Sequence, residues 1–73
     1  MEFEEMAKEL KPLEILFNFH FNEEQLVIWY SFMQYYTLDT FKKAIEKTIL
    51  TCNRMPTLAD IFKNLPQKEA QIL

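Results

Sequence analysis

The chain has 73 residues, of which 49% are hydrophobic and 15% aromatic, and its formal net charge is −3. A chain of this length buries only about 60% of its unfolded surface, so it forms one domain that depends on a dense core. Glycine is absent, which excludes the glycine-rich loops that bind phosphates or dinucleotides. We expect one all-α domain over residues 1–66 and a short tail over residues 67–73.

The charge is unevenly distributed along the chain. Residues 1–39 contain eight acidic and two basic residues, a net charge of −6, whereas residues 40–73 contain three acidic and six basic residues, a net charge of +3. The single cysteine, Cys52, excludes an intramolecular disulfide and fits a reducing cytosol. No run of about 18 apolar residues indicates a membrane span, and no signal peptide is indicated. We therefore expect a cytoplasmic protein.

The first predicted helix spans residues 2–16. Its apolar residues recur at spacings of three and four, which makes one stripe: Phe3, Met6, Ala7, Leu10, Leu13 and Phe17. Pro12 lacks an N–H and crowds the preceding turn, so we expect a kink or break near Lys11. Residues 17–21 alternate apolar and polar but are too few for a sheet, which predicts an extended connector whose phenyl rings fill the core.

The second predicted helix begins at Asn22, which forms a capping-box pattern with Gln25. Its buried stripe is predicted to contain Leu26, Trp29, Tyr30, Met33 and Tyr36. Val27, Phe32 and Tyr35 are predicted to lie to the sides of this stripe and to widen it. Thr37 is predicted to cap the third helix, whose apolar face extends to Cys52. Asn53 is predicted to end this helix in the left-handed conformation, which Asn tolerates where Gly is lacking.

A short fourth helix is predicted before Pro66. Thr57 and Asp60 again have capping-box spacing. The side chains expected to face inward are Leu58, Ile61, Phe62 and Leu65. The predicted fold is therefore a compact all-α bundle of four short helices.

Catalytic chemistry finds little support in the residue types and their spacing. His20 lies between two phenylalanines without a neighbouring nucleophile and orienting carboxylate, which favours a surface or structural role. Cys52 lies on an apolar stripe, where a thiol usually serves as a small hydrophobic group. Ligands for a zinc site are missing. We expect a protein that is not an enzyme and that holds no cofactor or metal.

Two sets of residues are candidates for contact with a protein partner. Glu2, Glu5 and Glu9 lie on the acidic first helix, where they form either a solvated face or a docking surface for a basic partner. Phe32 and Tyr35 lie beside the buried stripe of the second helix and are candidates for exposed aromatic contacts. Exposed aromatic residues also make a homodimer an alternative.

Three basic residues are candidates for phosphate contacts. Lys43, Lys47 and Arg54 recur at i, i+4 and i+11, which places them on one side of the third predicted helix. No aromatic residues are interleaved with them as a platform for single-stranded nucleic acid. Direct DNA binding is therefore an alternative that we do not favour.

The order of several short motifs resembles a known family. A middle helix contains Trp29-Tyr30, the next contains Lys43-Ala44-Ile45, and the last begins with the sequence of residues 56–61, Pro-Thr-Leu-Ala-Asp-Ile. This order is similar to that of the amino-terminal domain in the phage replicative-helicase loader and inhibitor family. The resemblance covers roughly residues 3–65.

The resemblance implies a helical protein of a phage or mobile element that binds a replicative helicase or its loader in the cytoplasm of a bacterial host. Members of the family have a long carboxy-terminal tail that is implicated in gripping the helicase, whereas seven residues follow Pro66 here. Loading and inhibition of the helicase both remain open. A second hypothesis is a small phage-encoded inhibitor of a host defence protein, comparable to an anti-CRISPR protein, that acts through its acidic first helix.

Overall fold

The computed structural model describes residues 1–66, and the predicted tail over residues 67–73 lies outside the described part. Within residues 1–66 there are helices and no strand. The helices are α1 (Phe3–Glu9), α2 (Lys11–Phe17), α3 (Glu23–Met33), α4 (Leu38–Thr51) and α5 (Leu58–Lys63). Helices α1 and α2 together are the first helix of the sequence prediction, so the predicted all-α bundle is confirmed.

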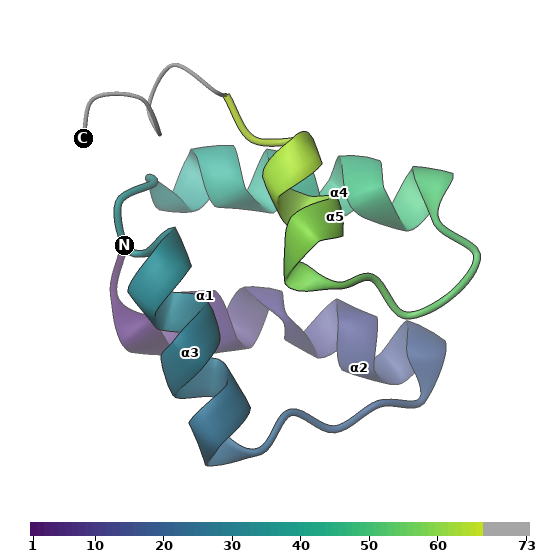
Figure 1. The fold of residues 1–73 in the computed structure, drawn as a ribbon, viewed down its shortest axis with the longest axis horizontal. Coiled ribbons are helices and arrows are strands. Elements are labelled where there is room, and N and C mark those ends of the chain that lie inside the picture. The colour runs from purple at the N-terminus through teal and green to yellow at the C-terminus, as the bar shows by residue number, and fades with distance from the viewer. Residues whose placement is uncertain (67–73) are drawn as a thin grey trace.

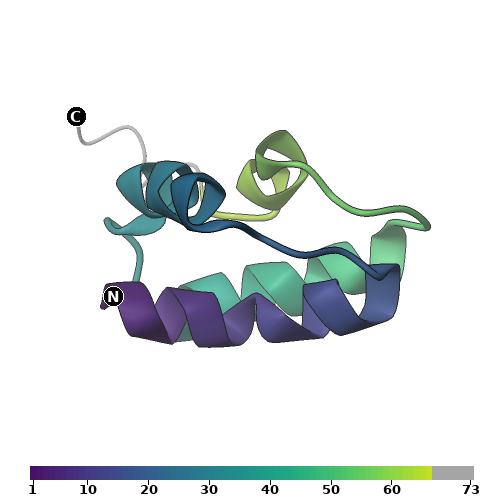
Figure 2. The same cartoon turned by 90° about the horizontal axis from the view of Figure 1, so that it is seen from below.

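The helices form two layers (Figure 2). Helices α1, α2 and α4 lie in one layer, and α3 and α5 cross them in the other. Figure 1 shows that the α1–α2 pair and α4 run in the same direction along the longest dimension of the molecule. Helix α4 packs against both α1 and α5, while α1 also packs against α3. The core therefore lies between the layers, and each layer has an outer face toward solvent.

The break between α1 and α2 is caused by Pro12. Proline occupies the first turn of α2, where its missing N–H leaves no helical hydrogen bond unmade. The preceding Leu10 keeps near-helical backbone angles (φ −83°, ψ −11°), so α2 continues along the direction of α1. The interruption predicted near Lys11 is confirmed.

The connector between α2 and α3 begins with an Asn in the left-handed conformation. Asn18 has φ 51° and ψ 52°, and it is the one non-glycine residue of the described part with positive φ. Asn tolerates this conformation better than most residues. The chain then extends to bury Phe21, whose ring meets the Phe19 ring edge-on at 5.0 Å. The prediction that phenyl rings of the connector enter the core is confirmed for Phe21, whereas Phe19 is half-buried.

The predicted capping residues begin their helices as expected. The Asn22 side chain accepts a hydrogen bond from the Gln25 backbone at 2.8 Å, and the Gln25 side chain accepts one from the Asn22 backbone at 2.9 Å. The Thr37 side chain caps α4, and Thr57 forms a capping box with Asp60 at the start of α5. These contacts depend on residues three apart in sequence, so they can be predicted without knowledge of the fold.

The predicted end of the third helix is wrong. Helix α4 ends at Thr51, and Cys52 is extended (φ −110°, ψ 137°). Asn53 does not have positive φ. The extended backbone leads toward Met55, which must itself be extended because Pro56 follows it. A left-handed residue is not needed at this helix end.

The core combines residues from both layers. Its fully enclosed members include Phe41 of α4 and Ile61 of α5. The buried apolar side chains are Met6, Leu10, Leu13, Phe21, Trp29, Met33, Tyr36, Phe41, Ala44, Ile45, Ile61 and Leu65. Thr48 is the buried polar residue of the described part, and its hydroxyl donates to the Ala44 carbonyl and accepts from the Asn64 amide, each at 2.7 Å. The hydrogen bond from Asn64 links α4 to the end of α5, whereas the bond to Ala44 lies within α4.

Candidate partner-binding surface

Helix α3 carries large apolar side chains both toward the core and toward solvent. Trp29 and Met33 are buried toward the core. On the solvent side, Ile28 is 55% exposed and Phe32 is 48% exposed, and Tyr35, in the turn after the helix, is 64% exposed. These three residues are spaced by four and three, so their side chains are neighbours along one stripe. Val27, which is also 55% exposed, lies beside them. We call these four residues the α3 outer surface.

The α3 outer surface continues onto α5. The ring of Phe32 meets the ring of Phe62 edge-on, with centroids 6.2 Å apart. Phe62 is half-buried and also packs edge-on against the buried Tyr36 at 6.4 Å. Such aromatic pairs favour a fixed ring orientation. Phe32 is therefore held in place while about half of its surface still faces solvent.

Acidic residues border the other end of the α3 outer surface. Glu23 and Glu24 lie in the first turn of α3, where the positive end of the helix dipole favours carboxylates. With Val27 and Ile28 they line an open depression of about 440 Å³. Both carboxylates are exposed. The surface thus has an apolar centre and an acidic edge, an arrangement found in protein interfaces.

Two of these four residues are predicted from the sequence as candidates for partner contact. Phe32 and Tyr35 were candidates, and both are exposed on the α3 outer surface. Val27 was expected to widen the buried stripe, and this expectation is wrong because its side chain faces solvent. Ile28 was missed. The signal for it was available, because Ile28, Phe32 and Tyr35 repeat at i, i+4 and i+7.

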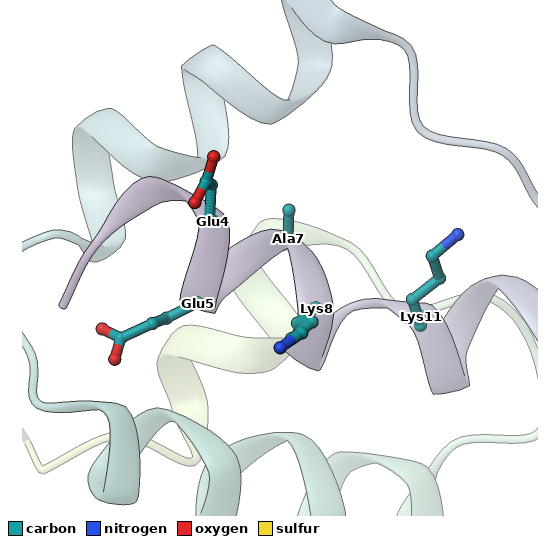
Figure 3. A pocket seen from close by; sticks show the side chains of 5 residues that line it. All are labelled: Glu4, Glu5, Ala7, Lys8 and Lys11. Carbon is teal, nitrogen blue, oxygen red and sulfur yellow. The ribbon is translucent and has the colours of Figure 1, made fainter.

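The acidic candidates of α1 lie apart from the α3 outer surface in sequence and do not form a purely acidic surface with their neighbours. The carboxylate of Glu5 accepts a hydrogen bond from the backbone of Glu2 at 2.8 Å, and Glu5 and Glu9 are both half-buried. An open depression of about 430 Å³ along this helix is lined by lysines as well as glutamates (Figure 3). Lys8 of α1 and Lys11 at the start of α2 give this depression a mixed charge.

The three candidate phosphate contacts do not form one strip. Lys43 and Lys47 are exposed on α4, and the Lys43 ammonium lies 3.4 Å from the Asp39 carboxylate. Arg54 lies beyond the end of α4, and its guanidinium lies 3.4 Å from the Asp60 carboxylate. The prediction that Arg54 continues the lysine stripe of the third helix is therefore wrong. The physical reason is the extended backbone at Cys52, which ends the helix at Thr51, three residues before Arg54.

The Asp60 carboxylate has a structural role at the start of α5. It accepts hydrogen bonds from the Thr57 backbone at 2.8 Å and from the Thr57 hydroxyl at 3.2 Å. The backbone hydrogen bond is the main cause that lowers the pKa of Asp60 below its ordinary value. Burial is the next largest effect and opposes this shift, whereas the Thr57 hydroxyl and Arg54 lower the pKa further. Arg54 and Asp60 thus stabilise a helix start.

Within residues 1–66, His20 lies near one carboxylate and Cys52 is a free thiol. The His20 Nδ1 atom lies 3.6 Å from the Glu14 carboxylate, which also accepts a hydrogen bond from the Phe21 backbone at 2.8 Å. The His20 side chain is otherwise exposed, in agreement with the predicted surface role. Cys52 is a free, half-buried thiol. Within residues 1–66, no three histidine, cysteine or acidic side chains are grouped so that they could bind a metal ion.

Comparisons with known proteins found no matching family model, no similar curated protein and no similar solved structure. The resemblance to the helicase loader and inhibitor family thus remains a prediction from the short motifs. None of the helices in the described part combines the length and the apolar character needed to cross a bilayer.

Proposed function

We propose that this chain is a small helical module that binds another protein through the α3 outer surface. The observation that carries the proposal is the exposure of four large apolar side chains on one side of a helix whose other side already fills the core: Val27, Ile28, Phe32 and Tyr35. Exposing such a set to water is unfavourable, and contiguous apolar patches on small proteins mark interaction sites. Folding alone gives no reason to place these residues there.

The spacing and charge of the α3 outer surface also indicate the chemistry of its partner. An apolar stripe with spacings of four and three complements the apolar face of a partner helix or a shallow apolar groove. Glu23 and Glu24 at its edge favour a partner that carries lysine or arginine beside its apolar residues. The resemblance of the sequence motifs supports a replicative helicase or its loader as this partner, which would make the chain a DNA replication accessory protein of a phage or mobile element.

A binding experiment with matched variants tests the proposal. The double variant Ile28→Ser/Phe32→Ser removes the centre of the surface, and Leu50→Ser, at a position 85% exposed on α4, is the control for losing an exposed apolar side chain elsewhere. Purified bacterial replicative helicase and its loader are each mixed with the chain at micromolar concentration and analysed by gel filtration. We expect a complex that Leu50→Ser retains and that the double variant weakens at least about tenfold, as for interface hot spots.

Three results would contradict parts of the proposal. Absence of a complex with both helicase and loader would argue against the replication partner. A complex that survives Ile28→Ser/Phe32→Ser would argue against the α3 outer surface. Light scattering of the chain alone provides the third test. If the natural chain is a dimer and the double variant is a monomer, a second copy of the chain, and not another protein, covers this surface.

A further inference from the structure

A second and smaller site lies at the start of α3, between the connector over residues 18–22 and the segment that precedes α5. It is a pocket of about 290 Å³. Its apolar and aromatic lining consists of Phe19, Phe21, Trp29, Met55, Pro56 and Leu58. No charged side chain lines it. A ligand for this pocket is therefore uncharged and about the size of one large side chain, because the volume is at the lower limit of small-molecule sites.

The polar residues that line the pocket are occupied by other contacts. Gln25 and Thr57 contribute to the capping boxes of α3 and α5. The two segments that carry them are thereby fixed, and the Phe21 ring meets the Trp29 ring edge-on at 5.1 Å. The walls are therefore held in position before any ligand binds, which lowers the entropic cost of binding.

Trp29 provides an unused hydrogen-bond donor at this site. Its side chain is nine-tenths buried, and its indole N–H makes no hydrogen bond with residues 1–66. Every fully buried side-chain nitrogen of the described part has a hydrogen-bond partner. The indole nitrogen of Trp29 has none, so it is not fully buried and reaches the surface. Trp29 is among the residues that line the pocket. Buried tryptophan usually finds an acceptor for its N–H, so an acceptor supplied by a ligand would complete the site.

We propose that this pocket binds one apolar side chain of an extended peptide segment, and that a backbone carbonyl of that segment accepts a hydrogen bond from the Trp29 indole. The neutral lining selects an uncharged side chain, and the free donor selects a carbonyl beside it. A peptide supplies both groups within one residue, and aromatic-lined grooves are a common way to bind extended peptides. This site is distinct from the α3 outer surface and does not depend on the function proposed for that surface.

The single tryptophan makes the proposal directly testable, since the chain gives one indole N–H signal in a ¹⁵N–¹H spectrum. The probe is N-acetyl-leucinamide, which has one apolar side chain between two carbonyls, and N-acetylglycinamide is the control that keeps the carbonyls alone. We expect N-acetyl-leucinamide to shift the indole signal saturably, with a Kd of about 1–10 mM as suits so small a ligand. N-acetylglycinamide should give no saturable shift. An equal response to both amides, or no saturable shift to about 50 mM, overturns the proposal.

Two leucine variants locate the binding. Leu58→Ala removes part of the pocket wall, whereas Leu50→Ala makes the same change at an exposed position of α4. We expect Leu58→Ala to raise the Kd for N-acetyl-leucinamide at least about threefold through lost apolar contact, and Leu50→Ala to leave it unchanged. Met55→Ala repeats the test at another wall residue if Leu58→Ala changes the circular dichroism spectrum. Unchanged affinity in a folded wall variant would place the probe elsewhere and overturn the assignment.

Discussion

Helices α3 and α4 use apolar residues in different ways. Helix α4 buries Phe41, Ala44, Ile45 and Thr48 on one face, and its opposite face carries mainly charged side chains. Helix α3 buries Trp29 and Met33 and also presents Ile28 and Phe32 to solvent. The pattern of α4 is what folding in water requires. Helix α3 has more apolar side chains than folding requires, because some of them face solvent. These exposed apolar side chains are the physical basis for assigning binding to α3.

The same substitution in the two helices gives the largest expected contrast. Phe41 is fully buried, so Phe41→Ala should lower the free energy of unfolding by about 3–5 kcal/mol. Phe32 is about half exposed, so Phe32→Ala should lower it by about 1 kcal/mol, mainly through the lost contact with Phe62. Urea unfolding followed by circular dichroism measures both. If Phe41→Ala is unfolded without urea, Phe41→Leu provides a milder core change. Similar losses at Phe41 and Phe32 would mean that α3 has no spare apolar face.

The polar link between α4 and α5 should have the next largest effect. Thr48→Val keeps the shape of the side chain but removes the hydroxyl that accepts from Asn64. We expect a loss of about 1–3 kcal/mol, because the Asn64 amide loses its short hydrogen bond. The control is Thr51→Val on the exposed side of the same helix, which should cost less than about 0.5 kcal/mol in the same urea measurement. Equal losses would show that the link does not stabilise α5.

A smaller effect should depend on pH through Asp60. Its folded-state pKa is lowered by the Thr57 backbone hydrogen bond, so the ionised carboxylate stabilises the fold above the ordinary pKa of about 3.9. This stabilisation is lost as the pH falls through the folded-state value. Asp60→Asn should therefore be less stable than the natural chain at pH 7, and the difference should shrink in acid.

Urea titrations at pH 7 and at successively lower pH measure this difference. Glu46→Gln, which removes one exposed carboxylate from α4, corrects for the change in overall charge. A difference between Asp60→Asn and the natural chain that does not vary with pH would contradict the assigned role of the carboxylate in capping α5.

The smallest effect on stability is expected at the centre of the α3 outer surface. Ile28→Ser should change the free energy of unfolding by no more than about 0.5 kcal/mol, because its side chain is already more than half exposed. The same urea measurement checks this value, and Ile45→Ser on the buried face of α4 is the contrasting variant. A loss above about 1.5 kcal/mol for Ile28→Ser would identify Ile28 as a core residue and remove it from the binding surface.

Features that depend on neighbouring residues could be predicted from the sequence. The capping boxes of Asn22 and Thr57, the break at Pro12 and the buried face of α4 are all found where the sequence indicated them. Their causes act over three or four residues, either as a hydrogen bond to a nearby backbone group or as repetition of apolar side chains on one helix face. Such causes are the same in any fold.

Features that depend on distant residues could not be predicted in this way. Arg54 was assigned to a lysine stripe, but it pairs with Asp60 because α4 ends at Thr51. The left-handed position fell on Asn18 and not on Asn53, because the turn after α2 needs it and the exit from α4 is extended. In both cases the path of the chain between helices decided the outcome, and periodicity carries no information about that path.

The sequence alone therefore determined that the chain is helical, where its helices begin, and that its apolar content is high. The tertiary structure decided what the periodicity of α3 did not, namely that Val27 and Ile28, which flank the predicted buried stripe, lie more than half exposed to solvent. Helix α1 packs against α3, the Phe21 ring of the connector meets the Trp29 ring, and Trp29 and Met33 join the core, while Ile28 and Phe32 stay about half exposed. This exposure arises from contacts between residues far apart in sequence, and it leaves these apolar side chains available for binding.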